Sequence, residues 1–309
     1  MFGIALVFIC VIVIYGFVSF SGDVARKANL FPVLAAGYFL RLVVQALTRN
    51  VQFFSHAAGG DYTQYEFLAD MITKLWDNRG LHYITGEELK YLGPTTLPPN
   101  LFAFVIYLNG GSTRTGCTAV IALAAALSML NFYMLAVELG ADRIIAKRAM
   151  MLLLFSPGFI LYTSDMYKDG LVLFLVLGAV GSGLRLTRRF SILHALFGAV
   201  CLLGLWRVRY YLVFLTLGPV IVGVSGIGSK SPVRPIFVTV ALIIGLIGVT
   251  SYTDALGTMN ESANKTFETV TNARFHAANQ TGGSAVTFDD GGSPYGAMPA
   301  KVIYTLFSP

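Results

Sequence analysis

The chain has 309 residues, of which 55% are hydrophobic and only 12% are charged. Soluble domains carry about 25% charged residues, so the composition excludes an ordinary soluble protein and predicts one that crosses a membrane several times. A net charge of +6 is modest, and we expect no nucleic-acid partner.

Eight apolar runs approach the roughly 20 residues that a helix needs to cross a bilayer. They lie near residues 2–20, 31–48, 116–138, 146–163, 170–187, 190–206, 210–227 and 235–252. The first run lacks basic residues before its apolar core, so we expect a retained span and not a signal peptide. Shorter runs near 100–109 and 298–307 are interpreted as re-entrant, interfacial or the start of a further span. The sequence therefore predicts an all-α polytopic membrane protein with about eight or nine transmembrane helices.

Basic residues occur in every second short loop between these runs. They are Arg26 and Lys27, then Arg143, Lys147 and Arg148, then Arg185, Arg188 and Arg189, and finally Lys230 and Arg234. Short basic loops face the cytoplasm, which makes the alternate segments external. Residues 49–115, 162–170, 206–209 and the tail from 253 are therefore expected on the outer face, where they are able to form one external site.

The first outer loop contains an amphipathic helical pattern that follows a Gly-Gly pair. Its apolar stripe consists of Tyr65, Leu68, Ile72, Leu75 and Trp76. This pattern predicts a helix that lies along the membrane surface. Asp61 stands at its N-terminus, either as an N-cap or as a general base, and by itself the local pattern favours the cap.

Polar and ionisable residues cluster at 162–170, between two apolar runs. We interpret this cluster as the turn that joins two membrane helices. Asp165 and Asp169 are expected to share one helical face, because they are four positions apart. Ionisable groups at a membrane boundary indicate a functional site, and the alternative is an interfacial cap that stops the helices.

Three arginines lie within or next to apolar runs. Arg207 and Arg209 follow the run at 190–206 and precede two tyrosines, so they are either a snorkelling pair or a phosphate-binding pair. Arg41 interrupts the run at 31–48, where a charge at the bilayer centre costs roughly 2.5–3.5 kcal/mol on insertion scales. We therefore expect Arg41 to have an acidic or phosphate partner, or to reach the interface.

Short patterns recur in a definite order along most of residues 35–290. They are Leu40-Arg41-Leu42, Gly60–Asp70, Asn100–Ser112, Phe155–Gly158, Lys168-Asp169-Gly170, Gly204–Tyr210 and Ala277–Ser284. Their order resembles that of GT-C glycosyltransferases, in particular the bacterial group similar to dolichyl-phosphate-mannose mannosyltransferases. Many members of that group have Arg-Pro where this chain has Arg207-Val208-Arg209.

The resemblance implies an inverting glycosyltransferase with its active site on the outer face of the cytoplasmic membrane. It would move a hexose or pentose from a polyprenyl-phosphate donor to a hydroxyl of a glycan, lipid or protein acceptor. Asp61 would be the catalytic base that deprotonates this hydroxyl. The transmembrane domain would cover residues 1–252, and residues 253–309 would form an outer polar tail whose abrupt end leaves truncation open.

The resemblance also suggests which residues bind substrate. Lys168, Arg207 and Arg209 would hold the departing lipid phosphate. Asp165 or Asp169 would orient the acceptor or ligate a divalent metal ion such as Mg²⁺ or Mn²⁺, although metal dependence varies in the family. Tyr65 is placed with these substrate-binding residues.

Two other functions remain open from the sequence. A lipid-linked glycan polymerase or ligase would use the outer arginines on a diphosphate carrier. A transporter or flippase would move a solute without forming a glycosidic bond, but the chain has no inverted-repeat pattern of the transporter kind.

Overall fold

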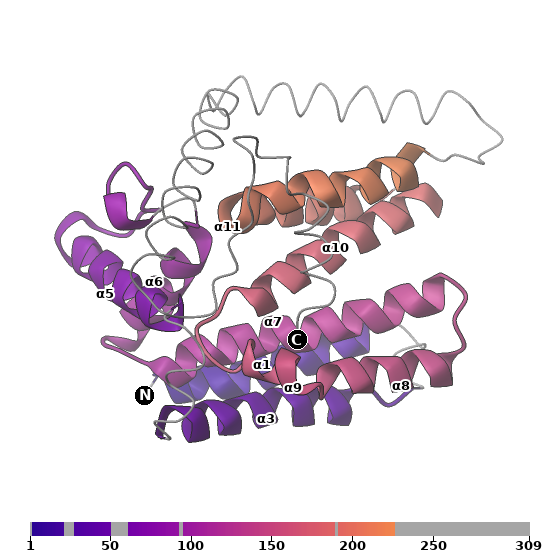
Figure 1. Cartoon of the computed structure of the whole chain (residues 1–309), viewed down its shortest axis with the longest axis horizontal. Coiled ribbons are helices and arrows are strands. Elements are labelled where there is room, and N and C mark those ends of the chain that lie inside the picture. Colours follow the sequence, from indigo (N-terminus) through magenta and orange to yellow (C-terminus); the bar gives the residue numbers. More distant parts are fainter. Residues whose placement is uncertain (1, 22–27, 51–60, 93–94, 189–190, 226–309) are drawn as a thin grey trace, which may run out of the picture. The chain divides into compact units, whose positions relative to one another are not determined.

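The computed structural model describes residues 2–21, 28–50, 61–92, 95–188 and 191–225, which form helices joined by turns and loops without strands. The helices are α1 (Phe2–Phe20), α3 (Phe31–Asn50), α5 (Asp61–Arg79), the short 3₁₀ helix η1 (Lys90–Leu92), α6 (Leu97–Asn109), α7 (Arg114–Glu138), α8 (Arg143–Leu154), α9 (Pro157–Leu161), α10 (Asp169–Arg188) and α11 (Ile192–Ser225) (Figure 1). The predicted all-α fold is confirmed for these residues. The predicted span at 235–252, the run at 298–307 and the polar tail lie outside them.

Five helical segments among the described residues are long and apolar enough to cross a membrane. They are Phe2–Phe20, Phe31–Thr48, Arg114–Glu138, Asp169–Leu186 and Ile192–Leu217. Large apolar side chains on α1, including Ile4, Phe8 and Ile12, are exposed, as expected for surfaces that face lipid. The fold is therefore that of a membrane-embedded protein, and the predicted count of eight or nine spans stays a prediction.

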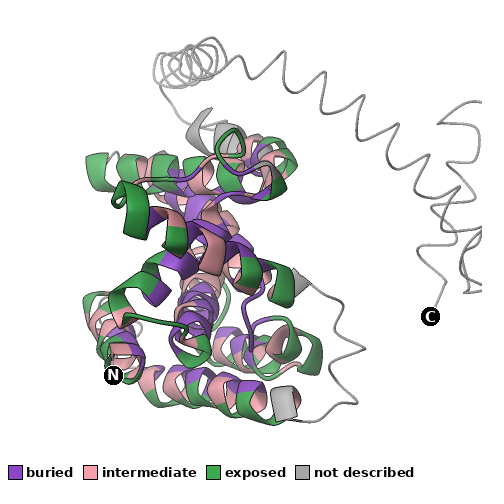
Figure 2. Ribbon diagram, turned by 90° about the vertical axis from the view of Figure 1, so that its left-hand side faces the viewer, coloured by how far each residue is buried: buried purple, intermediate pink, exposed green. Residues whose placement is uncertain are grey.

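Helix α7 is the centre of the packing. It contacts α1, α3, α8 and α10, and Figure 2 shows buried residues gathered where the helices meet. Small side chains such as Ala122, Ala125 and Ala126 line its buried surface, and they allow neighbouring helices to approach closely. Helices α1, α3, α8 and α10 thus pack around α7, while α11 packs against α10 in a separate apolar cluster.

The predicted span at 146–163 is not one continuous helix, because the chain forms two short helices there, α8 and α9; that the pair crosses the membrane stays a prediction. Ser156 has an extended backbone, with φ −64° and ψ 134°, as expected for a residue before proline. Pro157 cannot donate a backbone hydrogen bond, so it begins α9 and does not continue α8. The helix break leaves backbone carbonyls near the end of α8 that need other donors.

Arg41 supplies such a donor from α3. Its fully buried guanidinium donates from Nη2 to the carbonyl of Leu154 (3.2 Å), from Nε to Oγ1 of Thr163 (2.6 Å) and from Nη1 to the carbonyl of Gly37 (2.8 Å). The guanidinium carbon also lies 4.8 Å from the ring centroid of Phe159. The expected acidic partner is not found among the described residues, because these hydrogen-bond acceptors are neutral oxygens, and the phosphate alternative stays a prediction.

A glycine makes this contact between α3 and α8 possible. A Cβ atom at Gly37 would lie 2.8 Å from side-chain carbons of Leu154, closer than real Cβ contacts come. The absence of a side chain therefore lets α3 bring Arg41 to the end of α8.

Helix α11 contains a sharp bend at Arg209, whose φ of −151° and ψ of 87° are not helical. The rings of Trp206 and Phe214 are 6.4 Å apart, whereas eight positions of a straight helix span about 12 Å. The predicted spans 190–206 and 210–227 therefore correspond to the two helical parts of α11 on either side of this bend.

The predicted amphipathic helix is α5, which begins at Asp61 as expected. Its apolar stripe packs into the protein, since Leu68, Ile72 and Trp76 are buried together with Phe102 of α6. The predicted helix is confirmed, and its predicted position along the membrane surface stays a prediction.

Candidate functional site

The segment between α9 and α10 is not helical. Oδ1 of the buried Asp165 accepts from the backbone N–H of Met166 (2.7 Å), and its carbonyl accepts from the N–H of Tyr167 (2.7 Å). Such local bonds compete with helix formation. The expectation that Asp165 and Asp169 share one helical face is therefore wrong, because only Asp169 lies in α10.

Lys168 connects this segment to α5. Its Nζ donates to the hydroxyl of the buried Tyr65 across 3.0 Å and lies 5.6 Å from the centroid of the same ring. Beside this contact, the ring of Tyr62 meets the edge of Tyr167, with centroids 5.6 Å apart. The beginning of α5 is thus packed against the segment that precedes α10.

Asp169 connects the same segment to the bend of α11. It begins α10, where a carboxylate interacts favourably with the helix dipole. Its Oδ1 lies 3.3 Å from Nη2 of Arg209, and the two side chains are 38% and 32% exposed. The ion pair is therefore partly accessible to solvent or to a ligand.

Arg207 connects the bend of α11 to the loop before α6. Its carbonyl accepts from the N–H of Thr96 (2.9 Å), and its guanidinium carbon lies 5.7 Å from the ring centroid of Tyr83. The hydroxyls of Tyr83 and Thr96 are 2.7 Å apart. The Arg207 side chain is exposed and has no carboxylate within 4 Å among the residues that the structure describes.

The loop that carries Tyr83 is held from both sides. Asn100 of α6 accepts from the N–H of Ile84 and donates to its carbonyl, both at 2.9 Å. His82 lies 2.9 Å from Glu88, which raises the pKa of the histidine and lowers the pKa of the glutamate through their hydrogen bond. These contacts position Tyr83 next to Arg207.

These interactions include three separate contacts, Tyr65–Lys168, Asp169–Arg209 and Arg207–Tyr83, whose members are close in sequence at 168–169 and 207–209. We define the polar seam as Tyr65, Lys168, Asp169, Arg209, Arg207 and Tyr83. It brings together three of the segments predicted on the outer face, namely the loop at 49–115, the cluster at 162–170 and the turn at 206–209. The tail from 253 lies outside the described residues. Asp165 is buried and lies three positions before Lys168 in the sequence.

Asp61, the predicted base, is the first residue of α5 and precedes Tyr65 of the polar seam by about one turn. Its side chain lies outside the part of the chain that the structure describes. The structure therefore shows where the backbone of Asp61 lies, and its role as the base stays a prediction.

Glu66 and Asp70 are further carboxylates on α5, after Asp61 and before Asp77. Glu66 forms an ion pair with Arg114 at the start of α7. Burial, with a smaller contribution from Glu66, raises the pKa of Asp70, while Lys74 and Arg114 act in the opposite direction. Within the described residues, no group of three or more acidic, histidine or cysteine side chains is arranged to hold a metal ion, so the metal prediction stays open.

The sequence analysis missed Tyr83 and the contacts of Thr96. Both are brought to Arg207 from a distant part of the chain, and no local pattern marks them.

Comparison with protein-family models, with curated proteins and with solved structures finds no match to this chain.

Proposed function

We propose that this protein is a membrane glycosyltransferase of the GT-C type. It transfers a sugar from a polyprenyl-phosphate donor to an acceptor hydroxyl on the outer face of the cytoplasmic membrane. The main support is the polar seam, in which Lys168 contacts Tyr65 of α5, Arg209 pairs with Asp169 and Arg207 lies against Tyr83. The outward orientation rests on the distribution of basic loops in the sequence.

In this proposal, the cations of the polar seam bind the lipid phosphate. As the anomeric C–O bond breaks, its electron pair passes to the phosphate oxygen, and the cations offset the growing negative charge. Arginine holds phosphate oxygens with two parallel hydrogen bonds, which suits the exposed Arg207. The Arg209–Asp169 pair fixes one guanidinium at the bend of α11.

Asp61 accepts the proton of the acceptor hydroxyl as its oxygen attacks the anomeric carbon. Direct displacement of the phosphate inverts the configuration at that carbon. A carboxylate is able to accept this proton. The backbone of Asp61 begins α5 about one turn before Tyr65, the residue that Lys168 contacts.

The test is sugar transfer by the full-length protein in lipid nanodiscs, with a panel of polyprenyl-phosphate sugars. Asp61→Asn is expected to reduce the rate at least 100-fold, within the usual contribution of a general base. Asp77→Asn makes the same chemical change at an exposed position of α5 and is the matched control. Transfer by Asp61→Asn at the control rate would exclude Asp61 as the base.

Thermal stability of the purified protein identifies the ligand class. A donor that binds only the folded state, at 100 times its dissociation constant, adds about 2.7 kcal/mol. Stabilisation by a monophosphate sugar supports the proposal. Stabilisation by diphosphate-linked glycans alone would replace it with a polymerase or ligase, and solute movement without a new glycosidic bond would replace it with a transporter.

A further inference from the structure

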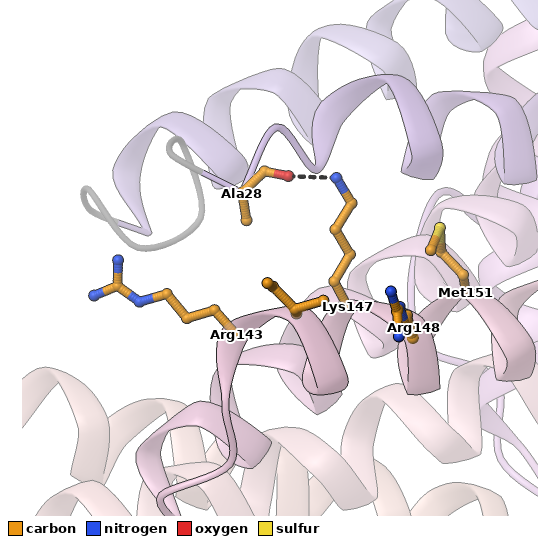
Figure 3. Close-up of a pocket in the computed structure, with 6 residues that line it drawn as sticks. Ala28, Arg143, Lys147, Arg148 and Met151 are labelled. Atoms are coloured by element: carbon orange, nitrogen blue, oxygen red, sulfur yellow. Dashed lines mark hydrogen bonds between the residues drawn. The ribbon is translucent and has the colours of Figure 1, made fainter.

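A second basic region lies outside the polar seam, at the N-terminal half of α8. A cavity of about 430 Å³ opens there between α8 and Ala28, which lies in the turn before α3 (Figure 3). It is lined by Ala28, Arg143, Ile144, Lys147, Arg148 and Met151. None of these residues belongs to the polar seam, so this cavity is a separate feature of the molecule.

Three cations line the cavity. Figure 3 shows Lys147 extending from α8 to the carbonyl of Ala28, to which its Nζ donates across 2.6 Å. This bond positions Lys147 and leaves two of its three N–H donors for a ligand. Arg143 and Arg148 are exposed, and neither has a carboxylate within 4 Å among the described residues.

The nearest acid in sequence does not neutralise this charge by pairing with the arginines. Oδ2 of Asp142 accepts from the backbone N–H groups of Ile144 (2.9 Å) and Ile145 (3.4 Å), so Asp142 serves as the N-cap of α8. The cavity therefore has an excess of positive charge, which favours an anionic ligand.

The same cavity borders an apolar surface. Ile144 lines it and is 63% exposed, while Leu152, two turns further along α8, is 76% exposed. A free phosphate ion would gain nothing from exposed isoleucine and leucine side chains. A lipid would place its phosphate among the cations and its acyl chains along these residues.

The distribution of charges along the sequence predicts that this loop faces the cytoplasm. Anionic lipids are concentrated in the cytoplasmic leaflet, and basic pockets between membrane helices on that side bind their head groups. We propose that the cavity lined by Arg143, Lys147 and Arg148 binds the phosphate head group of an anionic membrane lipid.

This proposal is tested by measuring the thermal stability of the full chain in a neutral detergent. Phosphatidylglycerol or phosphatidylcholine is added in increasing amounts. The variant Arg143→Gln/Arg148→Gln removes two cations but keeps the Lys147 bond to Ala28. The control Lys74→Gln/Arg79→Gln removes two exposed cations from α5. Phosphatidylglycerol is expected to stabilise the native chain and the control, with at least tenfold weaker apparent affinity for the cavity variant.

Equal stabilisation of all three proteins by phosphatidylglycerol would overturn the proposal, as would equal stabilisation of the native chain by phosphatidylcholine. Inorganic phosphate is the third probe. If millimolar phosphate reproduced the full effect and phosphatidylglycerol added nothing, the cavity would be a site for soluble phosphate and the lipid proposal would be wrong.

A second measurement does not depend on the variant folding. A photoactivatable phosphatidylglycerol with its reactive group near the phosphate is cross-linked to the native chain in vesicles, and the labelled peptides are mapped. Labelling of residues 143–151 supports the proposal, and labelling confined to other segments overturns it. Neither readout depends on glycosyltransferase activity, so this inference and the proposed function are tested separately.

Discussion

The ammonium group of Lys168 donates a hydrogen bond to the hydroxyl of Tyr65 across 3.0 Å. This contact joins the start of α5 to the segment before α10, although the two residues are 103 positions apart in sequence. Because Asp61 begins α5 and Asp169 begins α10, the contact relates the predicted base to the predicted phosphate-binding residues.

Removing either partner of this contact is expected to weaken the fold. Tyr65→Phe deletes only the hydroxyl, while Lys168→Met deletes the charge and keeps an unbranched apolar side chain. A double-mutant cycle in denaturation experiments should give a coupling free energy of about 0.5–1.5 kcal/mol, typical of one hydrogen bond. Additive effects of the two substitutions would show that the bond does not contribute to stability.

Rates of sugar transfer should distinguish the role of Lys168 from that of Tyr65. Lys168→Met is expected to reduce transfer at least tenfold more than Tyr65→Phe, because only the lysine supplies charge to the phosphate. Lys74→Met at an exposed position of α5 is the control. Equal losses for the two seam variants would assign Lys168 a purely structural role.

The Arg209–Asp169 pair should matter more for donor binding than for folding. Both side chains are about one-third exposed, and such ion pairs contribute about 0–1 kcal/mol to stability. Arg209→Gln is therefore expected to change the free energy of unfolding by less than about 1 kcal/mol. Titration with the donor should show at least tenfold weaker binding, which Arg209→Lys restores in part. A severely destabilised Arg209→Gln protein would contradict this division of roles.

Arg41→Met should destabilise the protein strongly. The substitution removes the donor for the buried carbonyl of Leu154, and a buried acceptor without a partner costs about 1–3 kcal/mol. Arg41→Lys retains a charge but cannot reproduce the planar set of donors to Gly37, Leu154 and Thr163. Both variants should unfold at lower temperature than the native chain in the same detergent. Native stability in Arg41→Met would show that the helix break needs no donor from α3.

The loop that holds Tyr83 should be most stable in mildly acidic solution. Because the pKa of His82 is raised, its stabilising contribution is complete below the ordinary histidine pKa of 6.5 and is lost as pH rises through the folded pKa. The lowered pKa of Glu88 makes its contribution complete above 4.5 and lost as pH falls through its folded pKa. Hydrogen exchange of residues 80–88, corrected for intrinsic rates, should therefore be slowest between about pH 4.5 and 6.5.

Glu88→Gln removes the acidic partner and is expected to abolish this pH dependence. Glu87→Gln, at the preceding exposed position, is the matched control and should keep it. An unchanged pH profile in Glu88→Gln would assign the effect to another group.

Much of the helical fold was predictable from local patterns. The position of α5 follows from the spacing of Leu68, Ile72 and Trp76, and the long apolar runs identify helices that fit a bilayer. The break between α8 and α9 also had a local signal in Pro157, but the surrounding apolar residues led to the prediction of a continuous span. Composition and hydrophobic periodicity are properties of residues close together in sequence, so they predict helices without knowledge of the tertiary structure.

The partners of individual side chains were decided by the packing of distant helices. Arg41 binds neutral oxygens near the break because α3 approaches α8 at Gly37, and Tyr83 meets Arg207 because α11 bends beside the loop before α6. The sequence by itself determined an all-α membrane protein and the start of α5 at Asp61. Only the tertiary structure joined Tyr65, Lys168 and Arg209 into the polar seam, since contacts between distant segments depend on the directions and separations of whole helices.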